Sequence, residues 1–247
     1  LRSRPLPFGE FMTYLSLCQD TRRECRVAGT STTPSTVVGQ TGRLGDIVAW
    51  VAQAYTEIQE AKDWNWLRST FTVNTVANDD TYAYGDCTDS RLSAVITRFS
   101  KWWLRNGDES NITLYLTSAG VGGENYLTPI DWIDFRERYK RGTQTTGQPI
   151  HVAIDPQGNL VLGPKPDAIY TINGEYQMSP QTLTADADVP EMPTRFHSLI
   201  MYRAMEKYGA ANGAPEVFNR GGYEGGKKVR ALERNQLPDV TLDGPLT

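Results

Sequence analysis

The chain has 247 residues, of which 39% are hydrophobic and 22% charged, and its formal net charge is -4. This length and composition support a folded core in one large domain or two small ones. The negative net charge excludes a protein whose whole surface binds nucleic acid, although it leaves room for a local basic strip. The sequence has neither the roughly 20 consecutive apolar residues that span a bilayer nor a signal-peptide pattern, so we expect no membrane insertion.

The N-terminal part is predicted to form an arm, a helix and a loop. Residues 1–11 contain two prolines and a glycine and have no core of their own. Thr13 is a suitable N-cap for a helix that runs to about Arg26 and stops by Gly29. The apolar side of this helix consists of Leu15, Cys18 and Cys25. The Gly-, Ser- and Thr-rich residues 29–42 are predicted to form a long exposed loop.

The three cysteines contain no CxxC pair. Cys18 and Cys25 share one face of the predicted helix but lie about 10 Å apart along its axis, which is too far for a disulfide. We therefore expect buried, reduced thiols, in agreement with assembly in a reducing compartment.

The longest stretch with helical periodicity runs from Leu44 to about Lys62. Its apolar residues recur at steps of three or four and share one face of an amphipathic helix, and Gln59 falls outside this face. The apolar positions are Leu44, Ile47, Val48, Val51, Tyr55 and Ile58. Trp64 and Trp66 follow, and because indole rings bury large areas we expect them to hold the next segment against the helix.

Beyond Trp66 the hydrophobic period changes to two, which predicts strands. The alternating positions are Phe71 and Val73, then Tyr82 and Tyr84. Asn106-Gly107 tolerates a positive φ and predicts a hairpin between a strand at Trp103 and a returning strand. The returning strand carries Ile112, Leu114 and Leu116.

A short helix and a second hairpin are predicted further along. The helix runs from Asp131, its N-cap, to Tyr139, with Trp132 and Phe135 beside Tyr139 on one face. The hairpin pairs residues 150–154 with residues 160–162, and residues 170–178 add a further strand to an antiparallel sheet.

Two helices are predicted near the C-terminal end. Thr194 caps the first, which ends at Asn212-Gly213, and Pro215 opens the second, which runs to about Asn235. The buried stripe of the first consists of Leu199, Ile200, Arg203, Met205 and Tyr208.

This order of elements predicts an α+β fold, in which a helical bundle formed by both ends of the chain receives an inserted antiparallel β domain. The bundle comprises residues 12–66 and 190–236, and the β domain comprises residues 67–189 with one short helix. Residues 1–11 and 237–247 are predicted to be flexible arms.

The string Gly221 to Lys227 fits the phosphate-binding pattern GxxxxGK, but Lys228 stands where that motif needs Ser or Thr, and no strand precedes it. The preferred interpretation is a helix whose glycines line a seam against another helix, and the alternative is a break in the helix. The seam positions are Phe218, Gly222, Gly225 or Gly226, Val229 and Leu232.

No motif predicts catalysis. His151 and His197 have no ligand partners at metal-binding spacing and no nucleophile elbow accompanies them, and His197 is interpreted as a helix-terminus or packing residue. The acidic groups Asp79, Asp80, Asp86 and Asp89, and Asp186, Asp188 and Glu191, are interpreted as solvated loops. We therefore expect no enzyme activity, no cofactor and no metal.

Three basic clusters stand out, and most such runs are solvated faces. They are Arg22, Arg23 and Arg26; Arg136, Arg138, Lys140 and Arg141; and Lys227, Lys228, Arg230 and Arg234. Any one of them is a candidate to face nucleic acid or an acidic protein.

Several stretches together resemble the head-to-tail adaptor (connector, or head completion) proteins of tailed bacteriophages. They are DWNWLRSTFTVNT at 63–75, LYLTSAGVGGENYLTPIDWIDFR at 114–136, GQPIHVAIDPQGNLVLGPKPDAIYTINGEY at 147–176 and VPEMPTRFHSLIMYRAMEKYGAANGAPEVF at 189–218. The resemblance covers most of residues 12–238.

The resemblance implies a structural virion protein that assembles in the host cytoplasm into a homo-oligomeric ring, commonly of twelve copies, beneath the portal. DNA would pass through the ring, and tail or nozzle proteins would attach below it. Residues proposed for the portal interface are Val217, Phe218, Tyr223, Arg230, Leu237 and Leu242. Candidates that face DNA in the lumen are Arg22, Arg23, Arg26, Arg138, Lys140 and Arg141.

Two other functions stay open at this stage. One is a tail-associated or receptor-binding β module, which an exposed aromatic patch on the β domain would favour. The other is a hydrolase, which a pocket that holds carboxylates with shifted pKa values would favour.

Overall fold

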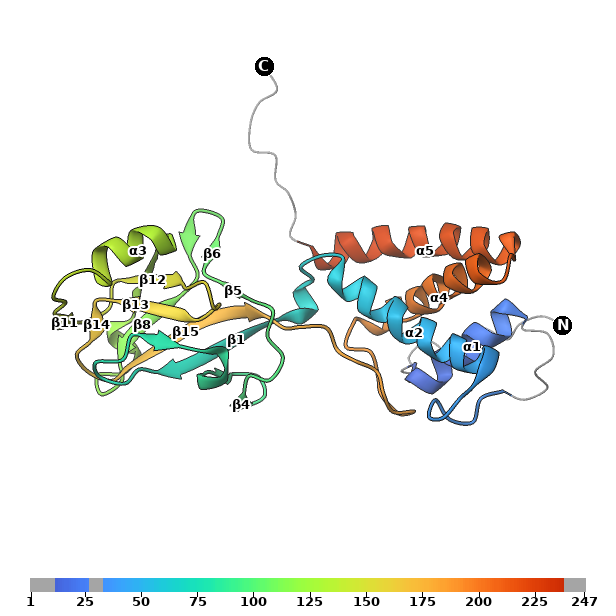
Figure 1. The fold of residues 1–247 in the computed structure, drawn as a ribbon, viewed down its shortest axis with the longest axis horizontal. Coiled ribbons are helices and arrows are strands. Elements are labelled where there is room, and N and C mark those ends of the chain that lie inside the picture. The colour runs from blue at the N-terminus through green and yellow to red at the C-terminus, as the bar shows by residue number, and fades with distance from the viewer. Residues whose placement is uncertain (1–11, 27–32, 238–247) are drawn as a thin grey trace, which may run out of the picture. The chain divides into compact units, whose positions relative to one another are not determined.

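The computed structural model describes residues 12–26 and 33–237 and divides into two compact units. One unit combines the chain up to Trp66 with the chain from Pro180 onward, and the other spans Leu67–Ser179. The first is helical and the second is built from strands (Figure 1). The predicted α+β fold is confirmed. The predicted arms, except Leu237, lie outside the described residues.

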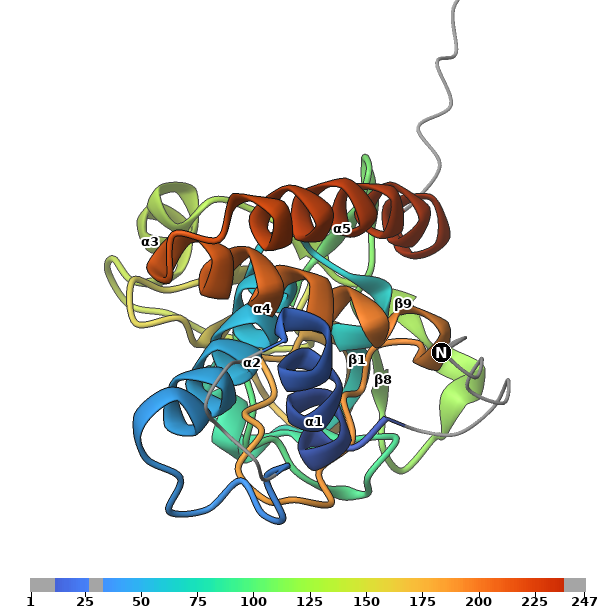
Figure 2. The ribbon, with the colours of Figure 1, turned by 90° about the vertical axis from the view of Figure 1, so that its right-hand side faces the viewer.

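The helical unit contains α1 (Tyr14–Cys25), α2 (Gly42–Glu60), α4 (Ser198–Ala211) and α5 (Pro215–Gln236), with the short 3-10 helices η1 (Asn65–Leu67) and η4 (Thr194–Phe196). α4 contacts each of the other three long helices. Figure 2 shows α4 between α5 on one side and α1 and α2 on the other. The centre of this unit is therefore α4, which carries its buried Leu199, Ile200, Ala204 and Met205.

α1 begins as predicted, because the Thr13 side chain accepts a hydrogen bond from the Ser16 amide at 3.2 Å. Its end differs. Arg26 takes the left-handed conformation with φ 48° directly after Cys25, so the helix stops before Gly29, which lies outside the described residues. Leu17 is buried in place of Leu15.

The described part of the predicted exposed loop, residues 33–41, is partly buried. Val37 is 6% exposed, and its amide donates to the Asp186 carboxylate at 2.5 Å. The loop prediction overlooked this anchor because a single carboxylate about 150 positions away leaves no local pattern.

α2 confirms the periodic stretch, with Ile47, Val51, Tyr55 and Ile58 buried. Gln59 is also buried, contrary to prediction, because its amide group makes two hydrogen bonds with the backbone of Gln181, at 3.0 and 2.7 Å. These bonds attach the chain after the last strand to the helical unit. The amide of Tyr14 also donates to the Asp188 carbonyl at 2.7 Å, so the boundary falls at Pro180 and not at residue 190.

The start of α4 differs from its prediction. Thr194 opens the 3-10 turn η4 and caps nothing, and α4 itself begins at Ser198 without a side-chain cap. The predicted ends are confirmed: Asn212 is the C-cap, Gly213 has φ 61°, and Pro215 occupies the first turn of α5.

The β unit has a seven-stranded sheet in the order β4-β3-β1-β15-β8-β9, with β5 also paired to β15, and a four-stranded sheet in the order β10-β12-β13-β2. The strands of the first are β1 (Arg68–Asn74), β3 (Thr88–Asp89), β4 (Ala94–Val95), β5 (Lys101–Trp103), β8 (Thr113–Leu116), β9 (Asn125–Tyr126) and β15 (Tyr170–Gln177). Those of the second are β2 (Thr81–Tyr82), β10 (Thr128–Pro129), β12 (His151–Ile154) and β13 (Leu160–Gly163). Two-stranded pairs join β6 (Arg105–Asn106) to β7 (Glu109–Ser110) and β11 (Thr146–Gly147) to β14 (Lys165–Pro166).

β15 is the central strand of this unit, since it pairs with β1, β5 and β8. The expected hairpin is therefore only partly right. β6 and β7 pair across a turn with Gly107 at φ 64°, whereas the return strand β8 pairs with β15 and not with the strand at Trp103. Most pairs are antiparallel, but β10 with β12 and β11 with β14 are parallel. Tyr84 lies in the 3-10 helix η2 (Tyr84–Asp86), not in a strand.

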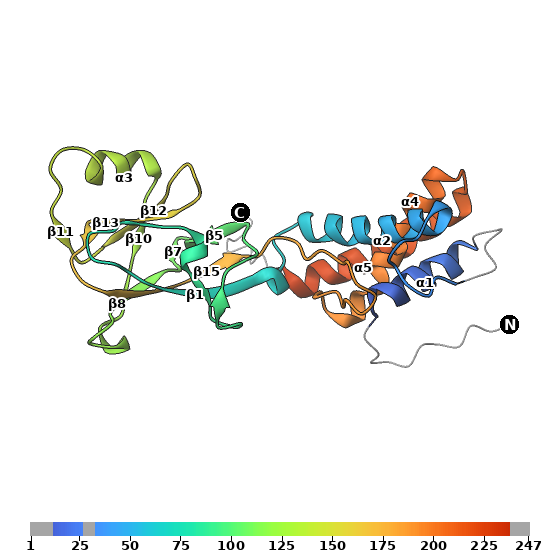
Figure 3. The same ribbon diagram turned by 60° about the horizontal axis from the view of Figure 1, so that its bottom comes forward.

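The short helix α3 (Trp132–Tyr139) covers β12 of the four-stranded sheet (Figure 3). Phe135 is fully buried against Ala153 and Val161, as its helical face predicts. Asp131 stands at the N-cap, but its side chain makes no capping hydrogen bond.

Candidate interaction surfaces

The glycine-rich stretch is helical throughout and forms part of α5. A Cβ added to Gly221 would lie 2.8 Å from the Tyr202 carbonyl oxygen on α4, and one added to Gly209 would lie 2.6 Å from the Phe218 nitrogen on α5. The predicted close seam is confirmed, with Gly221 in place of Gly222. Because the amides of 221–227 lie inside a helix, they are not arranged to bind phosphate, and the P-loop interpretation is excluded.

The opposite face of α5 has a different character. An added Cβ at Gly226 would meet no atom within 4 Å, and Gly222 has only the Glu206 carboxylate at 3.7 Å. Tyr223 is 66% exposed, and the Lys227 ammonium lies 3.8 Å from the centroid of its ring. Among the described residues, no other helix packs against Tyr223 or Gly226 on this outer face.

The structure separates the six proposed portal residues. Val217 and Phe218 lie at the start of α5, where Phe218 also closes the seam against Gly209. Tyr223 and Arg230 lie on the outer face, and Leu237 is the residue after the last helical turn. Leu242 lies outside the described residues. The five described candidates therefore do not share one face of α5.

The proposed DNA-facing residues belong to both units. Arg22, Arg23 and Arg26 stand at the end of α1, where Arg23 pairs with Asp20 at 2.6 Å. Burial raises the pKa of Asp20, and Arg23 opposes that shift. The β unit contributes a second set.

In that second set, Arg138, Lys140 and Arg141 follow one another around the end of α3. The Lys140 ammonium lies 2.8 Å from the buried carboxylate of Asp80, so this cation is committed to its own unit. Arg141 lies 3.9 Å from Glu137 on an exposed surface, where an ion pair contributes little.

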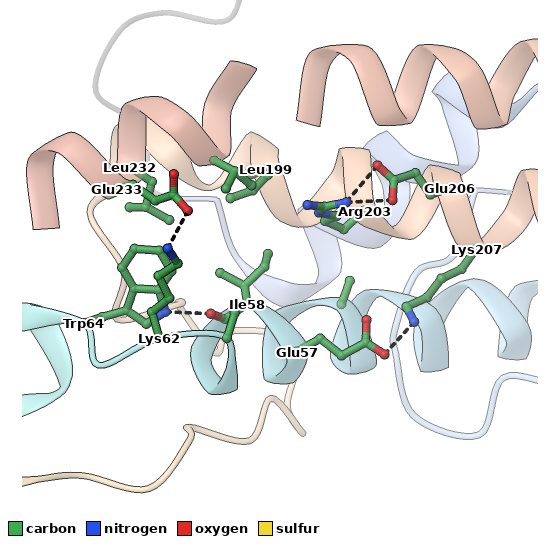
Figure 4. Close-up of a pocket in the computed structure, with 13 residues that line it drawn as sticks. Glu57, Ile58, Lys62, Trp64, Leu199, Arg203, Glu206, Lys207, Leu232 and Glu233 are labelled. Carbon is green, nitrogen blue, oxygen red and sulfur yellow. Dashed lines mark hydrogen bonds and ion pairs between the residues drawn. The ribbon is translucent and has the colours of Figure 1, made fainter. Parts of the chain in front are cut away.

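A pocket of about 230 Å³ lies between α2, α4 and α5 in the helical unit. Its floor is apolar, and Trp64, Ile58, Leu199 and Leu232 converge on it (Figure 4). Three ion pairs surround the opening: Lys62 with Glu233 at 3.1 Å, Lys207 with Glu57 at 2.7 Å and Arg203 with Glu206 at 2.8 Å. Since each cation has its own carboxylate, this opening carries no excess charge for a charged ligand.

An aromatic hollow of about 360 Å³ lies on the β unit, beside β5 and the start of α3. Trp103, Trp132 and Ile130 line it, and Lys101 and Arg105 stand at its edge. Arg105 donates to the Pro129 carbonyl at 2.6 Å, which leaves the rest of the guanidinium at the surface. Trp103 and Trp132 are only partly exposed, so this hollow is smaller than the exposed aromatic patch that would favour a β-domain binding module.

Most of the acidic groups are structural and not the solvated loops that we predicted. Asp89 is 1% exposed; burial opposes its ionisation, but hydrogen bonds from Tyr176, from two backbone amides and from Ser69 outweigh burial and lower its pKa. Asp188 accepts from the amides of Thr184 and Ala185, which lowers its pKa. Asp80 pairs with Lys140. The β-unit carboxylates thus hold loops and do not form the raised-pKa pair that a hydrolase would need.

The two histidines also have structural partners. The buried His197 places Nε2 at 2.9 Å from the Met192 carbonyl oxygen, and burial lowers its pKa, in agreement with a packing role. His151 Nδ1 lies 2.6 Å from the Tyr139 hydroxyl. Cys18, Cys25 and Cys87 are buried free thiols, and burial raises the pKa of each to about 12. Within residues 12–26 and 33–237 no group of three or more His, Cys, Asp or Glu side chains is arranged to hold a metal ion.

The model of the SU10 adaptor protein family matches residues 12–240, and the chain belongs to this family. The resemblance to head-to-tail adaptors of tailed bacteriophages is thereby confirmed, and the protein is a structural component of phage tail assembly. A comparison with curated proteins gives no match. Of the helices described, none has the length and apolar content to cross a bilayer.

Proposed function

We propose that this adaptor forms a homo-oligomeric ring, of about twelve copies as the resemblance implies, beneath the portal in the virion neck. Genomic DNA passes through the ring, and tail or nozzle proteins attach below it. The observation that carries the proposal is the family match over residues 12–240. The protein acts by contact and positioning, without catalysis, a cofactor or a metal.

The portal contact is proposed for the outer face and the C-terminal end of α5. Tyr223 supports this because a 66% exposed aromatic ring on a rigid helix is a typical interface anchor. Leu237, directly after the last helical turn, is included in this contact, and Leu242, outside the described residues, is proposed for it as well. Val217 and Phe218 belong to this surface only through their exposed edges, since Phe218 also packs on Gly209.

The tail-side contact is proposed for the β unit. Its aromatic hollow offers Trp103 and Trp132 together with two cations, a composition enriched at protein interfaces. The same hollow also supports the second candidate function, in which the protein is a tail-associated module that binds a partner through its β unit and does not contact the portal. Exposed Tyr126 and Val121, at 72% and 66%, extend the area available on the same unit.

The decisive experiment is the solution mass of the full chain by multi-angle light scattering, alone and after mixing with the portal ring of the same phage. The proposal predicts a stoichiometric portal complex even if the free protein is a monomer. Removal of residues 237–247 should weaken that complex and leave the thermal unfolding of the free protein unchanged. A wild-type chain that shows no mass increase with the portal would contradict the adaptor function and favour the tail-associated module.

A further inference from the structure

The C-terminal half of α5 carries the densest positive charge among the described helices. Residues 227–236 contain four cations, Lys227, Lys228, Arg230 and Arg234, and one carboxylate, Glu233, in a chain of net charge -4. A net charge of +3 over one helical segment is unusual for an acidic protein. It concentrates attraction for a polyanion at this place.

Three of these cations share one face. Lys227, Arg230 and Arg234 follow one another at steps of three and four, so they form a single stripe about 10 Å long. Together with Glu233 they line a shallow hollow of about 540 Å³ on the surface of the helical unit. We call these three residues the basic stripe.

The cations of the basic stripe are available to a ligand. Within the described residues, the side chains of Arg230 and Arg234 make no ion pair or hydrogen bond. The Lys227 ammonium lies 3.8 Å from the Tyr223 ring centroid and 3.4 Å from the Glu224 carboxylate, both on an exposed surface. Glu233, the carboxylate in the hollow, is paired with Lys62 at 3.1 Å. The negative charge of Glu233 is therefore largely balanced by Lys62, which follows α2.

Two cations of the other basic clusters differ in this respect. Arg23 is held by Asp20 and Lys140 by Asp80, each with the carboxylate on its own unit. A cation that is already paired gains little from a phosphate, because it must exchange one anion for another. The unpaired guanidiniums of the basic stripe gain the full charge-assisted hydrogen bonds.

We infer that the basic stripe on α5 is the surface that faces the phosphate backbone of double-stranded DNA. The inference rests on the proposed function and moves the outer face of α5 over residues 227–234, with Arg230, from the portal contact to the DNA contact. Tyr223, one turn before this segment, and Leu237 after it stay with the portal contact. Guanidinium groups bind phosphate through two parallel N–H donors, and the stripe offers no arrangement of side chains for reading bases. Binding is therefore independent of sequence and sensitive to salt, as a channel through which DNA slides requires.

The test compares two variants of the full chain with the same change in net charge. The stripe variant is Lys227→Gln, Arg230→Gln, Arg234→Gln, and the control is Arg195→Gln, Arg203→Gln, Lys207→Gln, which removes three cations from the other side of the seam. Affinity for a mixed-sequence 30-base-pair duplex is measured by fluorescence anisotropy over a range of salt concentrations. Circular dichroism melts establish that both variants fold.

The stripe variant should bind the duplex at least about tenfold more weakly near 0.1 M salt, and its salt slope should fall by up to about 2.7 if three phosphate contacts per copy are lost. The control should retain both values. An equal loss in the two variants, or no loss in the stripe variant, would overturn the inference. Light scattering with the portal ring is done in parallel, so that failure of portal binding in the wild type refutes the adaptor function separately from the DNA result.

Discussion

The two faces of α5 differ in what their residues contact. On the inner face, Gly221 and Gly225 bring the helix to contact distance of α4, and Leu232 is fully buried. On the outer face, Gly226 borders open space and Tyr223 is mostly exposed. Each helical glycine costs up to about 1 kcal/mol relative to alanine. Close packing on α4 offsets this cost for the inner glycines, whereas Gly226 has no such packing among the described residues.

The largest expected effect is on the inner face. Leu232→Ala should lower the free energy of unfolding by about 3 kcal/mol, because the side chain is fully buried beside the pocket and the space would remain unfilled. Tyr223→Ala, on the outer face of the same helix, is the matched control and should change it by less than about 0.5 kcal/mol. Urea unfolding of both variants measures the difference, and equal losses would show that the two faces are not distinct.

A smaller loss is expected at the seam itself. Gly221→Ala should destabilise the protein by about 1–2 kcal/mol, since the new methyl group would lie 2.8 Å from a backbone oxygen of α4 and the helices would have to separate. The measurement is the thermal midpoint by differential scanning calorimetry. A midpoint equal to or above that of the wild type would mean that the seam is loose enough to accept a methyl group.

The pH dependence of stability tests the core of the helical unit further, because this core includes the buried His197 at the start of α4. Burial lowers its pKa below 6.5, so the unfolded state binds the proton more readily than the folded state. The stability that neutral His197 contributes is fully present above pH 6.5 and decreases as the pH falls below that value. His197→Gln should reduce the loss of stability between pH 7.5 and 5.5, as measured by urea unfolding at both values. A variant that shows the same loss as the wild type would exclude His197 as its source.

The smallest effect has the opposite sign. Gly226→Ala should stabilise the free protein by about 0.5–1 kcal/mol, because the position is helical and an added Cβ meets nothing. The same thermal measurement used for Gly221→Ala gives a direct contrast within one helix. Destabilisation here would indicate a contact on the outer face of the free protein that the structure does not contain.

Local patterns in the sequence predicted the elements that depend on local forces. The period of α2, the capping oxygen of Thr13, the break at Asn212-Gly213 and the apolar face of α3 are each set by residues within a few positions of one another. These predictions held because the same residues specify and stabilise the element. The order of helices and strands, and hence the α+β class, followed from them.

Features set by distant partners were missed. The side-chain amide of Gln59 is buried because it donates a hydrogen bond to the Gln181 carbonyl and accepts one from the Gln181 amide. Likewise, the loop at Val37 is held by the distant Asp186 carboxylate, which accepts a hydrogen bond from the Val37 amide. Strand β8 was predicted to pair with the strand at Trp103, but it pairs with β15, a longer strand that lies more than 50 residues later in the chain. At the candidate site, the sequence predicted a glycine seam but chose Gly222 where Gly221 faces α4. The two positions are neighbours, and the rotation of α5 about its axis, which the sequence does not specify, decides which of them faces α4.

The inserted β unit leaves and rejoins the helical unit through neighbouring strands. Arg68 on β1 stands opposite Gln177 on β15, and the Met178 amide donates to the Leu67 carbonyl at 2.7 Å, so the two junctions of the insertion are held together by the first rungs of its own sheet. A different domain could therefore be inserted at the same place if its first and last strands were adjacent and antiparallel. Recombination between related genes at codons 66/67 and 179/180 would exchange the entire β unit as a cassette, and the helical unit would keep both of its ends in place.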